Sequence, residues 1–235
     1  MLGATTIGTL RRVTSTDADL LSHERPLVAR GQVVVGIDEV GRGALAGPLT
    51  VGAVVVVNDA PAPAGLNDSK LLTVSQREAL VEPLRAWSAD WSLGSVSARE
   101  IDAWGLRLAL AVAATRALDG LRICPTHALI DGSFNFLTAP LDVGFGVDPP
   151  PRLAYARLPY TTIVKGDQRS AAIAAAAVLA KVSRDQLMVQ LHEACPEFGW
   201  SSNKGYGAPQ HLAAIREQGP TLQHRQSWRL PQWQH

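Results

Sequence analysis

Cysteine and long apolar runs are both scarce in this chain of 235 residues. Its two cysteines, Cys124 and Cys195, offer no disulfide framework and fit a reducing compartment. No apolar run reaches the roughly 18–20 residues that a membrane-spanning helix requires. The first residues also lack the basic start and long apolar stretch of a signal peptide. We therefore expect a cytoplasmic protein with no membrane partner.

The chain also has almost no net charge. The chain carries 22 Lys and Arg against 21 Asp and Glu, a formal net charge of +1, so composition alone indicates no nucleic-acid partner. Any basic surface must be local, and the segment from residue 196 onward is the candidate, because it interleaves basic and aromatic residues. Such a mixture can grip phosphates and bases, although tryptophans that pack on the domain explain it more simply. The residues concerned are Lys204, Arg216, Arg225, Arg229, Trp200, Tyr206, Trp228 and Trp233.

A metal site built from histidine and cysteine also lacks its parts. His192 and Cys195 have half of a zinc-binding spacing, but the chain offers no second half. We interpret this pair as a thiol at a helix end near a surface histidine.

Two acids and a glycine-rich segment lie close together in the stretch VVVGIDEVGRGALAGPL over residues 33–49. Its segment GRGALA matches the dinucleotide fingerprint, which needs a helix that begins at the glycines. Instead Pro48 follows at once, and then a β-branched run that predicts a second strand. Too few residues separate the strands for a βαβ crossover, which takes about 10–12 residues. The pattern predicts a strand ending near Asp38 and Glu39, a glycine-rich turn, and an antiparallel strand.

The remaining pattern predicts alternating helices and strands after this hairpin. We expect an extended or weakly ordered leader over residues 1–30, helices over 73–90, 97–121, 169–194 and 209–218, strands over 91–96, 127–131 and 160–164, and loops over 58–70 and 138–159. Thr73 and Gln76 fit a capping box, Pro83 should kink or divide its helix, and Gly105 should divide the next. This order predicts an α/β protein whose mixed central sheet is flanked by helices.

Four acids share one topological position. Asp38, Glu39 and Asp131 end strands, and Asp167 lies between a strand and a helix. If they converge, they repel one another unless cations balance them, and carboxylates without histidine or cysteine suit Mg²⁺ or Mn²⁺. Two such ions about 3.5–4 Å apart are a known device for phosphodiester cleavage. Singly, Asp167 could be a helix cap, Asp131 a turn residue, and the other two surface residues.

Six segments together resemble the successive motifs of bacterial ribonuclease HII, in that family's order. They are GIDEVGRGALAGPLTVGAVV, LNDSKLLT, ALIDGS, TTIVKGDQRS, IAAAAVLAKVSRDQLM and NKGYGAPQHLAAI, and they cover most of residues 33–218. The resemblance implies a ribonuclease H-like fold with a small helical C-terminal segment. It divides the chain into the leader (1–30), a catalytic core (31–195) and a substrate-contacting segment (196–235).

The resemblance also implies an activity. The family cleaves RNA in RNA–DNA hybrids and nicks duplex DNA on the 5′ side of an embedded ribonucleotide, leaving 3′-OH and 5′-phosphate ends. It uses Mg²⁺ or Mn²⁺, two ions per site during catalysis. We accordingly expect RNA–DNA hybrids and ribonucleotide-containing duplex DNA as partners, no organic cofactor, and a monomer.

Site residues follow from the same motifs. Asp38, Glu39, Asp131 and Asp167 would be the metal-binding catalytic acids. Gly41, Arg42 and Gly43 would contact the ribose 2′-OH, mainly through backbone, and Tyr206 would pack on the sugar. Lys70, Lys181 and Arg184 resemble residues near the scissile region or the phosphates. The 2′-OH is the group that distinguishes RNA from DNA at a site.

The chain departs from the family pattern at three places. Ala177 stands where a serine is expected, Gly105-Leu106 where Asn-Ile is expected, and Ala208 where a threonine is expected. These changes leave open a catalytically weak nucleic-acid-binding protein on the same fold. A nucleotide-cofactor enzyme that uses the GRGALA turn is a third alternative. The four acids argue against the weak binding protein, and Pro48 argues against the nucleotide-cofactor enzyme. The loop over 138–159 is longer than the family needs. It could fold over the cleft, but we interpret it as a tolerated surface insertion.

Overall fold

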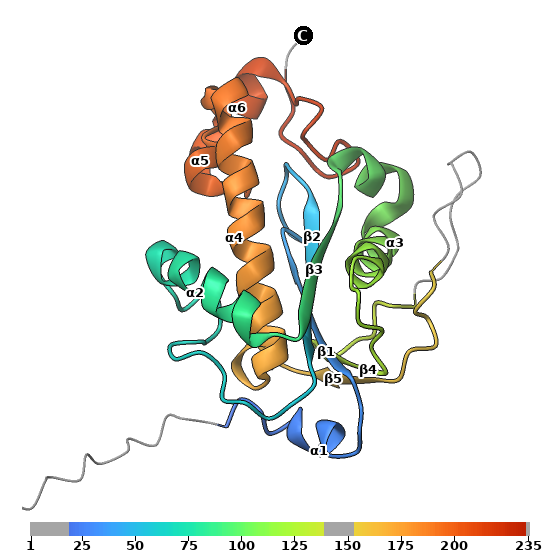
Figure 1. Ribbon diagram of the computed structural model, residues 1–235. Coiled ribbons are helices and arrows are strands. Elements are labelled where there is room, and N and C mark those ends of the chain that lie inside the picture. Colours follow the sequence, from blue (N-terminus) through green and yellow to red (C-terminus); the bar gives the residue numbers. More distant parts are fainter. Residues whose placement is uncertain (1–18, 139–152, 234–235) are drawn as a thin grey trace, which may run out of the picture.

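The computed structural model describes residues 19–138 and 153–233. In this part of the chain five strands form one sheet in the order β3-β2-β1-β4-β5 (Figure 1). The strands are β1 (Val34–Val40), β2 (Leu49–Val56), β3 (Asp90–Val96), β4 (His127–Asp131) and β5 (Tyr160–Ile163). Strands β1, β2 and β3 pair antiparallel, whereas β4 is parallel to β1 and β5 is parallel to β4. The predicted mixed sheet and its opening hairpin are confirmed.

Helices cover both faces of the sheet. Figure 1 shows α4 (Ala171–Ala194) and α2 (Val74–Trp87) on one side and α3 (Ala98–Asp119) on the other. All eight residues of β2 are buried as a result. A Cβ atom at Gly36 would lie 2.2 Å from the backbone of Ala172, and one at Gly52 would lie 2.4 Å from the backbone of Ala176. Glycine on the strands and alanine on α4 therefore let this helix pack unusually close to the sheet.

Local signals set the helix boundaries with one exception. Thr73 caps α2 in a capping box with Gln76, as predicted, and Gly105 (φ 73°, ψ 159°) breaks α3 as predicted. The prediction that Pro83 would kink or divide its helix is wrong, because α2 runs through it to Trp87 without a non-helical residue. The ring removes a single backbone donor, and the buried side chains beside it, which pack against α4, hold the helix together.

The second part of the predicted leader, residues 19–30, is ordered. Residues 1–18 lie outside the described part, but residues 19–30 contain the short helix α1 (Arg25–Val28). Glu24 is buried, and its Oε1 accepts hydrogen bonds from the Ser170 hydroxyl (2.6 Å) and the Ala172 amide (2.9 Å). The expectation of weak order is therefore wrong from Asp19 onward. The chain is anchored here at the N-terminus of α4, where free amide donors attract a carboxylate.

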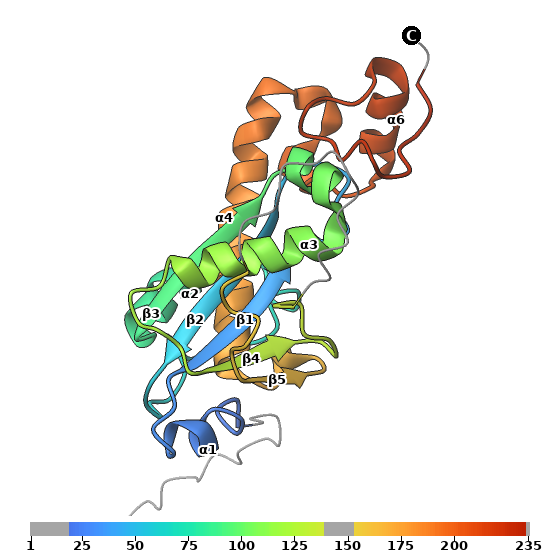
Figure 2. The same ribbon diagram turned by 90° about the vertical axis from the view of Figure 1, so that its right-hand side faces the viewer.

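The C-terminal segment forms a small helical cluster at one end of the molecule. It contains η2 (Pro196–Phe198), α5 (Trp200–Asn203) and α6 (Pro209–Gln218), the last with the predicted bounds. The rings of Phe198 and Trp200 stack with centroids 5.2 Å apart, and Trp200 is fully buried. Figures 1 and 2 place this cluster beyond the sheet, at the C-terminal end of α4. Trp200 therefore packs within the protein, which is the simpler of the two interpretations offered for it.

Most of the predicted 138–159 loop lies outside the described residues, so its interpretation stays a prediction. Between β5 and α4 the chain forms the short turn η1 (Gly166–Gln168), which contains Asp167. No helix among the described residues is both long and apolar enough to cross a membrane.

Candidate active site

The parallel pairing of β1 and β4 brings the predicted acids to one edge of the sheet. Ile37 is the register partner of Ile130, so Asp38 and Asp131 follow at equivalent positions on neighbouring strands. They face a cavity of about 340 Å³. Its lining residues are Asp38, Glu39, Val40, Gly41, Arg42, Gly43, Ser69, Lys70, Asp131, Ala177, Lys181 and Tyr206. Nine of the eleven predicted site residues therefore line one cavity, and Asp167 and Arg184 lie beside it.

Asp167 forms an ion pair with Lys70, which lines the cavity. The Lys70 ammonium lies 3.1 Å from Asp167 Oδ2, so the buried carboxylate is paired with a largely exposed side chain. The η1 turn is fixed in addition by Asp131, whose Oδ1 accepts a hydrogen bond from the Gly166 amide at 2.6 Å. These contacts place Asp167 next to the other acids despite the long sequence separation.

The acids repel one another. Burial and the nearby charges of Glu39, Asp131 and Asp167 raise the pKa of Asp38 well above its ordinary value. Burial also raises the pKa of Glu39, where Arg42 opposes the shift from 3.5 Å, and the pKa of Asp167, where Lys70 opposes it. Raised pKa values of this kind mean that the folded protein concentrates more negative charge here than it can easily hold alone.

The donor set fits a hard divalent cation. It offers carboxylate oxygens without histidine or sulfur, which is the chemistry that Mg²⁺ and Mn²⁺ prefer. In the described part of the chain, however, no three acidic, histidine or cysteine side chains are already gathered around one point. Lys70 and Arg42 hold carboxylate oxygens instead. A cation would be held by Asp38, Glu39, Asp131 and Asp167 after these two basic side chains release them.

The glycine-rich loop over residues 41–48 forms the opposite wall. Gly41 has φ +83°, and a Cβ there would lie 2.2 Å from Arg184 Nε, so only glycine fits the position. A Cβ at Gly43 would meet nothing within 4 Å, which leaves the backbone approachable from the cavity. The loop joins antiparallel strands, and no helix begins at its glycines. The nucleotide-cofactor alternative is therefore wrong.

Arg184 lies behind this loop and does not face the cavity. Its guanidinium is fully buried and donates to the carbonyl oxygens of Pro48 (2.8 Å), Lys204 (2.9 Å) and Ala46 (3.1 Å). The predicted role near a phosphate stays a prediction, and in this structure Nε, NH1 and NH2 each donate to a backbone carbonyl. Arg184 thereby ties the glycine-rich loop to the turn that carries Tyr206.

Tyr206 lies on an exposed turn beside the loop. It is 37% exposed, and its ring lies over the Arg184 guanidinium at 5.6 Å. The turn is tied closely to the loop, since a Cβ at Gly205 would lie 2.3 Å from the Ala46 carbonyl oxygen. This placement excludes a core position, and the contact to a ligand stays a prediction.

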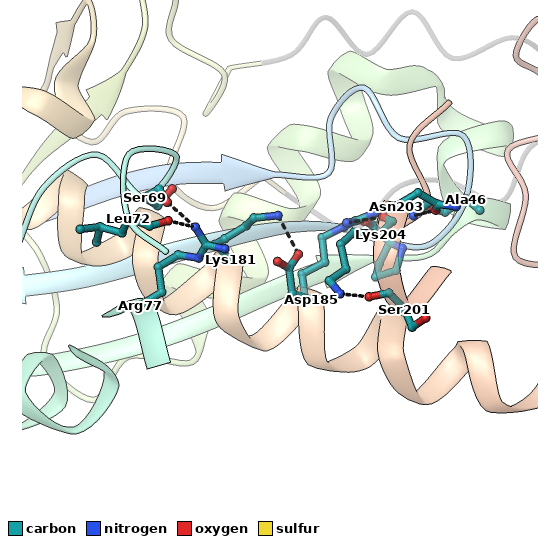
Figure 3. Close-up of polar contacts among 12 residues, drawn as sticks. Ala46, Ser69, Leu72, Arg77, Lys181, Asp185, Ser201, Asn203 and Lys204 are labelled. Atoms are coloured by element: carbon teal, nitrogen blue, oxygen red, sulfur yellow. Dashed lines mark hydrogen bonds and ion pairs between the residues drawn. The ribbon is translucent and has the colours of Figure 1, made fainter. Parts of the chain in front are cut away.

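Three basic side chains lie near α4 in Figure 3: Lys181 lines the cavity, whereas Arg77 and Lys204 line a neighbouring pocket. Figure 3 shows Lys181 and Asp185 side by side on α4, where the ammonium and carboxylate are 2.7 Å apart. Arg77 lies on one side of this pair and Lys204 on the other. Arg77 is buried and donates to the carbonyl oxygens of Ser69 (2.7 Å) and Leu72 (2.6 Å). It therefore fixes the segment that presents Lys70, a role that its sequence surroundings did not reveal.

Two of the three departures from the family pattern affect the surroundings of the site. Ala177 lines the cavity, so the missing hydroxyl would have faced the ligand. Ala208 is the N-cap residue of α6, and no side chain caps that helix. Gly105 produces the break in α3 described above.

Comparison with known proteins identifies the family. The ribonuclease HII family model matches residues 35–231. The chain belongs to the ribonuclease HII family. A ribonuclease HII of Streptomyces avermitilis is 45% identical over 208 residues, covering 87% of this chain and 82% of the relative.

Two solved structures are similar to the fold. The ribonuclease H2 of Pyrococcus horikoshii OT3 has a TM-score of 0.63 and 29% identity, over 83% of this chain and 93% of that chain. The ribonuclease HII of Archaeoglobus fulgidus, solved in a complex with PCNA, has a TM-score of 0.63 and 25% identity, over 86% and 98% of the two chains. The predicted family and the predicted ribonuclease H-like α/β fold are both confirmed.

Proposed function

We propose that this protein is a divalent-cation-dependent endoribonuclease. It cleaves RNA in RNA–DNA hybrids and nicks duplex DNA on the 5′ side of an embedded ribonucleotide, leaving 3′-OH and 5′-phosphate ends. One observation carries the proposal: a single cavity joins Asp38, Glu39 and Asp131 to the exposed glycine-rich backbone at residues 41–43 in a ribonuclease HII chain.

The acids and the cation divide the chemistry. Asp38, Glu39, Asp131 and Asp167 would hold Mg²⁺ or Mn²⁺, with two ions per site during catalysis. Such ions supply Lewis acidity toward a phosphate oxygen and lower the pKa of water. The raised pKa of Asp38 supports this assignment, because a site that disfavours its own charge gains most from a cation.

The rest of the cavity would bind and orient the nucleic acid. The backbone of Arg42 and Gly43 approaches the ribose 2′-OH, and the exposed ring of Tyr206 packs on the adjacent sugar. Lys70 and Lys181 line the same cavity, and they would exchange their carboxylate partners for phosphate oxygens. Rigid placement of the reacting phosphate is the main contribution of such groups.

The alternative of a catalytically weak binding protein receives little support. The three departures leave all four carboxylates in place. Ala177 removes a hydroxyl from the cavity wall and Ala208 removes a helix cap. We expect such losses to affect rate and stability rather than the type of reaction.

The deciding experiment is a nicking assay on end-labelled duplex DNA that contains one ribonucleotide. We expect a single nick on its 5′ side with Mg²⁺ or Mn²⁺, no nick with EDTA, and no nick in the matched all-DNA duplex. An RNA–DNA hybrid in parallel measures the second activity. Absence of nicking with either metal, or equal cutting of the all-DNA duplex, would overturn the proposal.

The cytoplasmic location and monomeric state stay predictions. The first rests on the scarcity of cysteine and the absence of a signal-peptide pattern. Sedimentation of the purified protein tests the second.

A further inference from the structure

A second buried arginine, Arg225, grips the glycine-rich loop from the C-terminal segment. Its side chain is fully buried. Its NH1 donates to the Arg42 carbonyl oxygen at 2.9 Å, and its NH2 donates to the carbonyl oxygens of Gly41 (2.6 Å) and Gly47 (3.2 Å). Nothing in the family motifs quoted above assigns this residue a role.

The geometry of the peptide bond gives these contacts a consequence. In a trans peptide the C=O and the N–H point in opposite directions in one plane. The Gly41 carbonyl shares its peptide with the Arg42 N–H, and the Arg42 carbonyl shares its peptide with the Gly43 N–H. Because Arg225 draws both carbonyls toward the interior, both N–H groups point away from it, toward the side where residues 41–43 line the cavity.

Both N–H groups are free to bind a ligand. Over residues 19–138 and 153–233, neither the Arg42 nor the Gly43 amide donates a hydrogen bond to another protein group. Their neighbours along the loop are used internally: the Leu45 and Ala46 amides donate to the Gly205 carbonyl oxygen. Two adjacent unpaired donors at an open backbone form a site for one acceptor oxygen.

We propose that Arg225 is a positioning residue that aims the Arg42 and Gly43 N–H groups at the 2′ oxygen of the ribonucleotide. The proposal rests on the proposed function and deepens it, because it assigns the distinction between ribose and deoxyribose to a residue outside the cavity. Arg225 touches no substrate, and it acts through the direction of two peptides.

Arg225 is itself held in place. Its amide donates to the Leu45 carbonyl oxygen at 2.9 Å. The next two residues are pinned by Asp102, whose carboxylate accepts from the Gln226 amide (2.8 Å) and the Ser227 amide (2.9 Å). The guanidinium also lies over the ring of Trp228 at 4.9 Å. A positioning group needs such second supports to hold its partner within a small tolerance.

The positive charge of Arg225 strengthens the Arg42 and Gly43 N–H groups as hydrogen-bond donors. No carboxylate forms an ion pair with it within the described residues, so carbonyl dipoles balance its charge. Burial and the neighbouring Arg184 lower the pKa of Arg225 to about 10, which leaves the guanidinium charged at neutral pH. A cation on the carbonyl side polarises the peptide and makes its N–H a stronger donor.

Arg184 provides a matched control for burial and bonding. It is equally buried and also donates to three carbonyl oxygens. The amides that share peptides with its Ala46 and Lys204 acceptors are already used: Gly47 donates to the Gln223 carbonyl (2.8 Å) and Gly205 to Asn203 Oδ1 (2.8 Å). Replacing Arg184 therefore disturbs a buried clamp without releasing the two donors at Arg42 and Gly43.

The test compares Arg225→Lys with Arg184→Lys on two duplexes. One duplex contains a single ribonucleotide and the other is all DNA, and affinity is measured in an Asp131→Asn background so that neither is cut. We expect Arg225→Lys to bring the ribose preference close to one and Arg184→Lys to lower it much less, because lysine lacks the planar fork that holds the Gly41 and Arg42 carbonyls. Single-turnover nicking by the enzyme with Asp131 intact should fall about 100-fold in Arg225→Lys.

A milder variant covers the possibility that Arg225→Lys does not fold. Asp102→Ala leaves Arg225 in place but frees the backbone after it, and should reduce the ribose preference to an intermediate value. If Arg225→Lys folds and its ribose preference is unchanged, the inference is overturned. If Arg225→Lys does not fold, an unchanged ribose preference in Asp102→Ala overturns it. A protein with Arg225 and Asp102 intact that shows neither ribose preference nor nicking would instead overturn the proposed function.

Discussion

The two walls of the cavity are built on opposite principles. The acid wall, defined as Asp38, Glu39, Asp131 and Asp167, gathers like charges whose burial and mutual repulsion raise the pKa of Asp38 and Asp167. The loop wall, defined as residues 41–48 with Tyr206, is held from behind by two buried arginines that have six carbonyl acceptors between them. In the proposed function a cation would complete the acid wall, whereas the loop wall is held in place before any ligand arrives.

This difference indicates a division of labour. A site that must take up and release cations gains from carboxylates that are destabilised when it is empty. A site that must recognise one oxygen atom gains from donors that are fixed in advance, because no ordering is then needed on binding. Changes in the acid wall should therefore affect chemistry at little cost in stability, and changes in the loop wall should affect both.

The largest effect is expected from Asp38→Asn, which breaks the acid wall. The substitution keeps the shape of the side chain and removes charge that a cation needs, so nicking should fall about 1000-fold, the equivalent of roughly 4 kcal/mol of transition-state stabilisation. Because burial and the neighbouring acids raise the pKa of Asp38, its charge destabilises the folded protein, and the melting temperature without metal should stay equal or rise. Nicking at a near wild-type rate, or a clear fall in melting temperature, would contradict the assignment of Asp38 to the cation.

The second effect concerns the exposed part of the loop wall. Tyr206→Ala should slow nicking about 100-fold, since misplacement at a reacting phosphate has this size of effect, and the 37% exposure of the side chain predicts little change in melting temperature. Tyr206→Phe keeps the ring and should slow nicking far less. If Tyr206→Ala instead unfolded at a clearly lower temperature and its activity followed the folded fraction, the ring would be part of the core.

The third effect is a pH dependence of opposite sign in the two walls. His211 accepts from Trp200 (3.1 Å) and contacts His224 (3.0 Å) and the Tyr206 carbonyl oxygen (2.8 Å), all behind the loop wall. Burial lowers the pKa of His211, and burial with His211 lowers that of His224 to about 4. The unfolded chain then binds protons first, so this pair loses stability as pH falls from 6.5 toward 4.

Denaturant titrations at pH 7 and pH 5 measure this dependence. The unfolding free energy falls from pH 7 to pH 5, and His224→Gln should make this fall about 2 kcal/mol smaller. For Asp38 the sign is reversed, because a raised pKa lets the folded protein bind the proton first as pH falls. Without metal, Asp38→Asn should therefore remove a gain in stability on acidification. Equal pH slopes in both variants and the unsubstituted protein would contradict the comparison.

The smallest effect is a gain in unfolding free energy beside the loop wall, at Ala208. Ala208 begins α6 without a side-chain cap, directly after the turn that carries Tyr206. Ala208→Ser should raise the unfolding free energy by about 1 kcal/mol, because a hydroxyl can accept a hydrogen bond from the first free amides. The exposed substitution Gln210→Ala, further along the same helix, provides a control without a cap. No gain from Ala208→Ser would show that the backbone at this turn does not admit capping geometry.

The sequence predicted the acid wall better than the loop wall, for a physical reason. Strand ends, capping boxes and the break at Gly105 are encoded by a few neighbouring residues, and the parallel pairing of strands then brings Asp38 and Asp131 together. Buried clamps are not encoded in this way. Arg184 and Arg225 bind backbone carbonyls far away in the sequence, and any residue type could supply such an acceptor.

The same reason explains the two errors in the predicted fold. Glu24 anchors the segment after residue 18 through Ser170 and Ala172, which are distant partners that no local pattern reveals. Pro83 is a local helix breaker whose effect is overridden by packing against α4. In both cases tertiary contacts outweighed a local propensity.

The most direct measurement is a crystal structure of the Asp131→Asn protein with Mn²⁺ and a duplex that contains one ribonucleotide. We expect anomalous density for manganese beside Asp38, Glu39 and Asp167, and the 2′ oxygen within hydrogen-bond distance of the Arg42 and Gly43 amides. A duplex bound on another face, or a 2′ oxygen with no contact to the 41–43 backbone while manganese lies at the acids, would contradict this expectation.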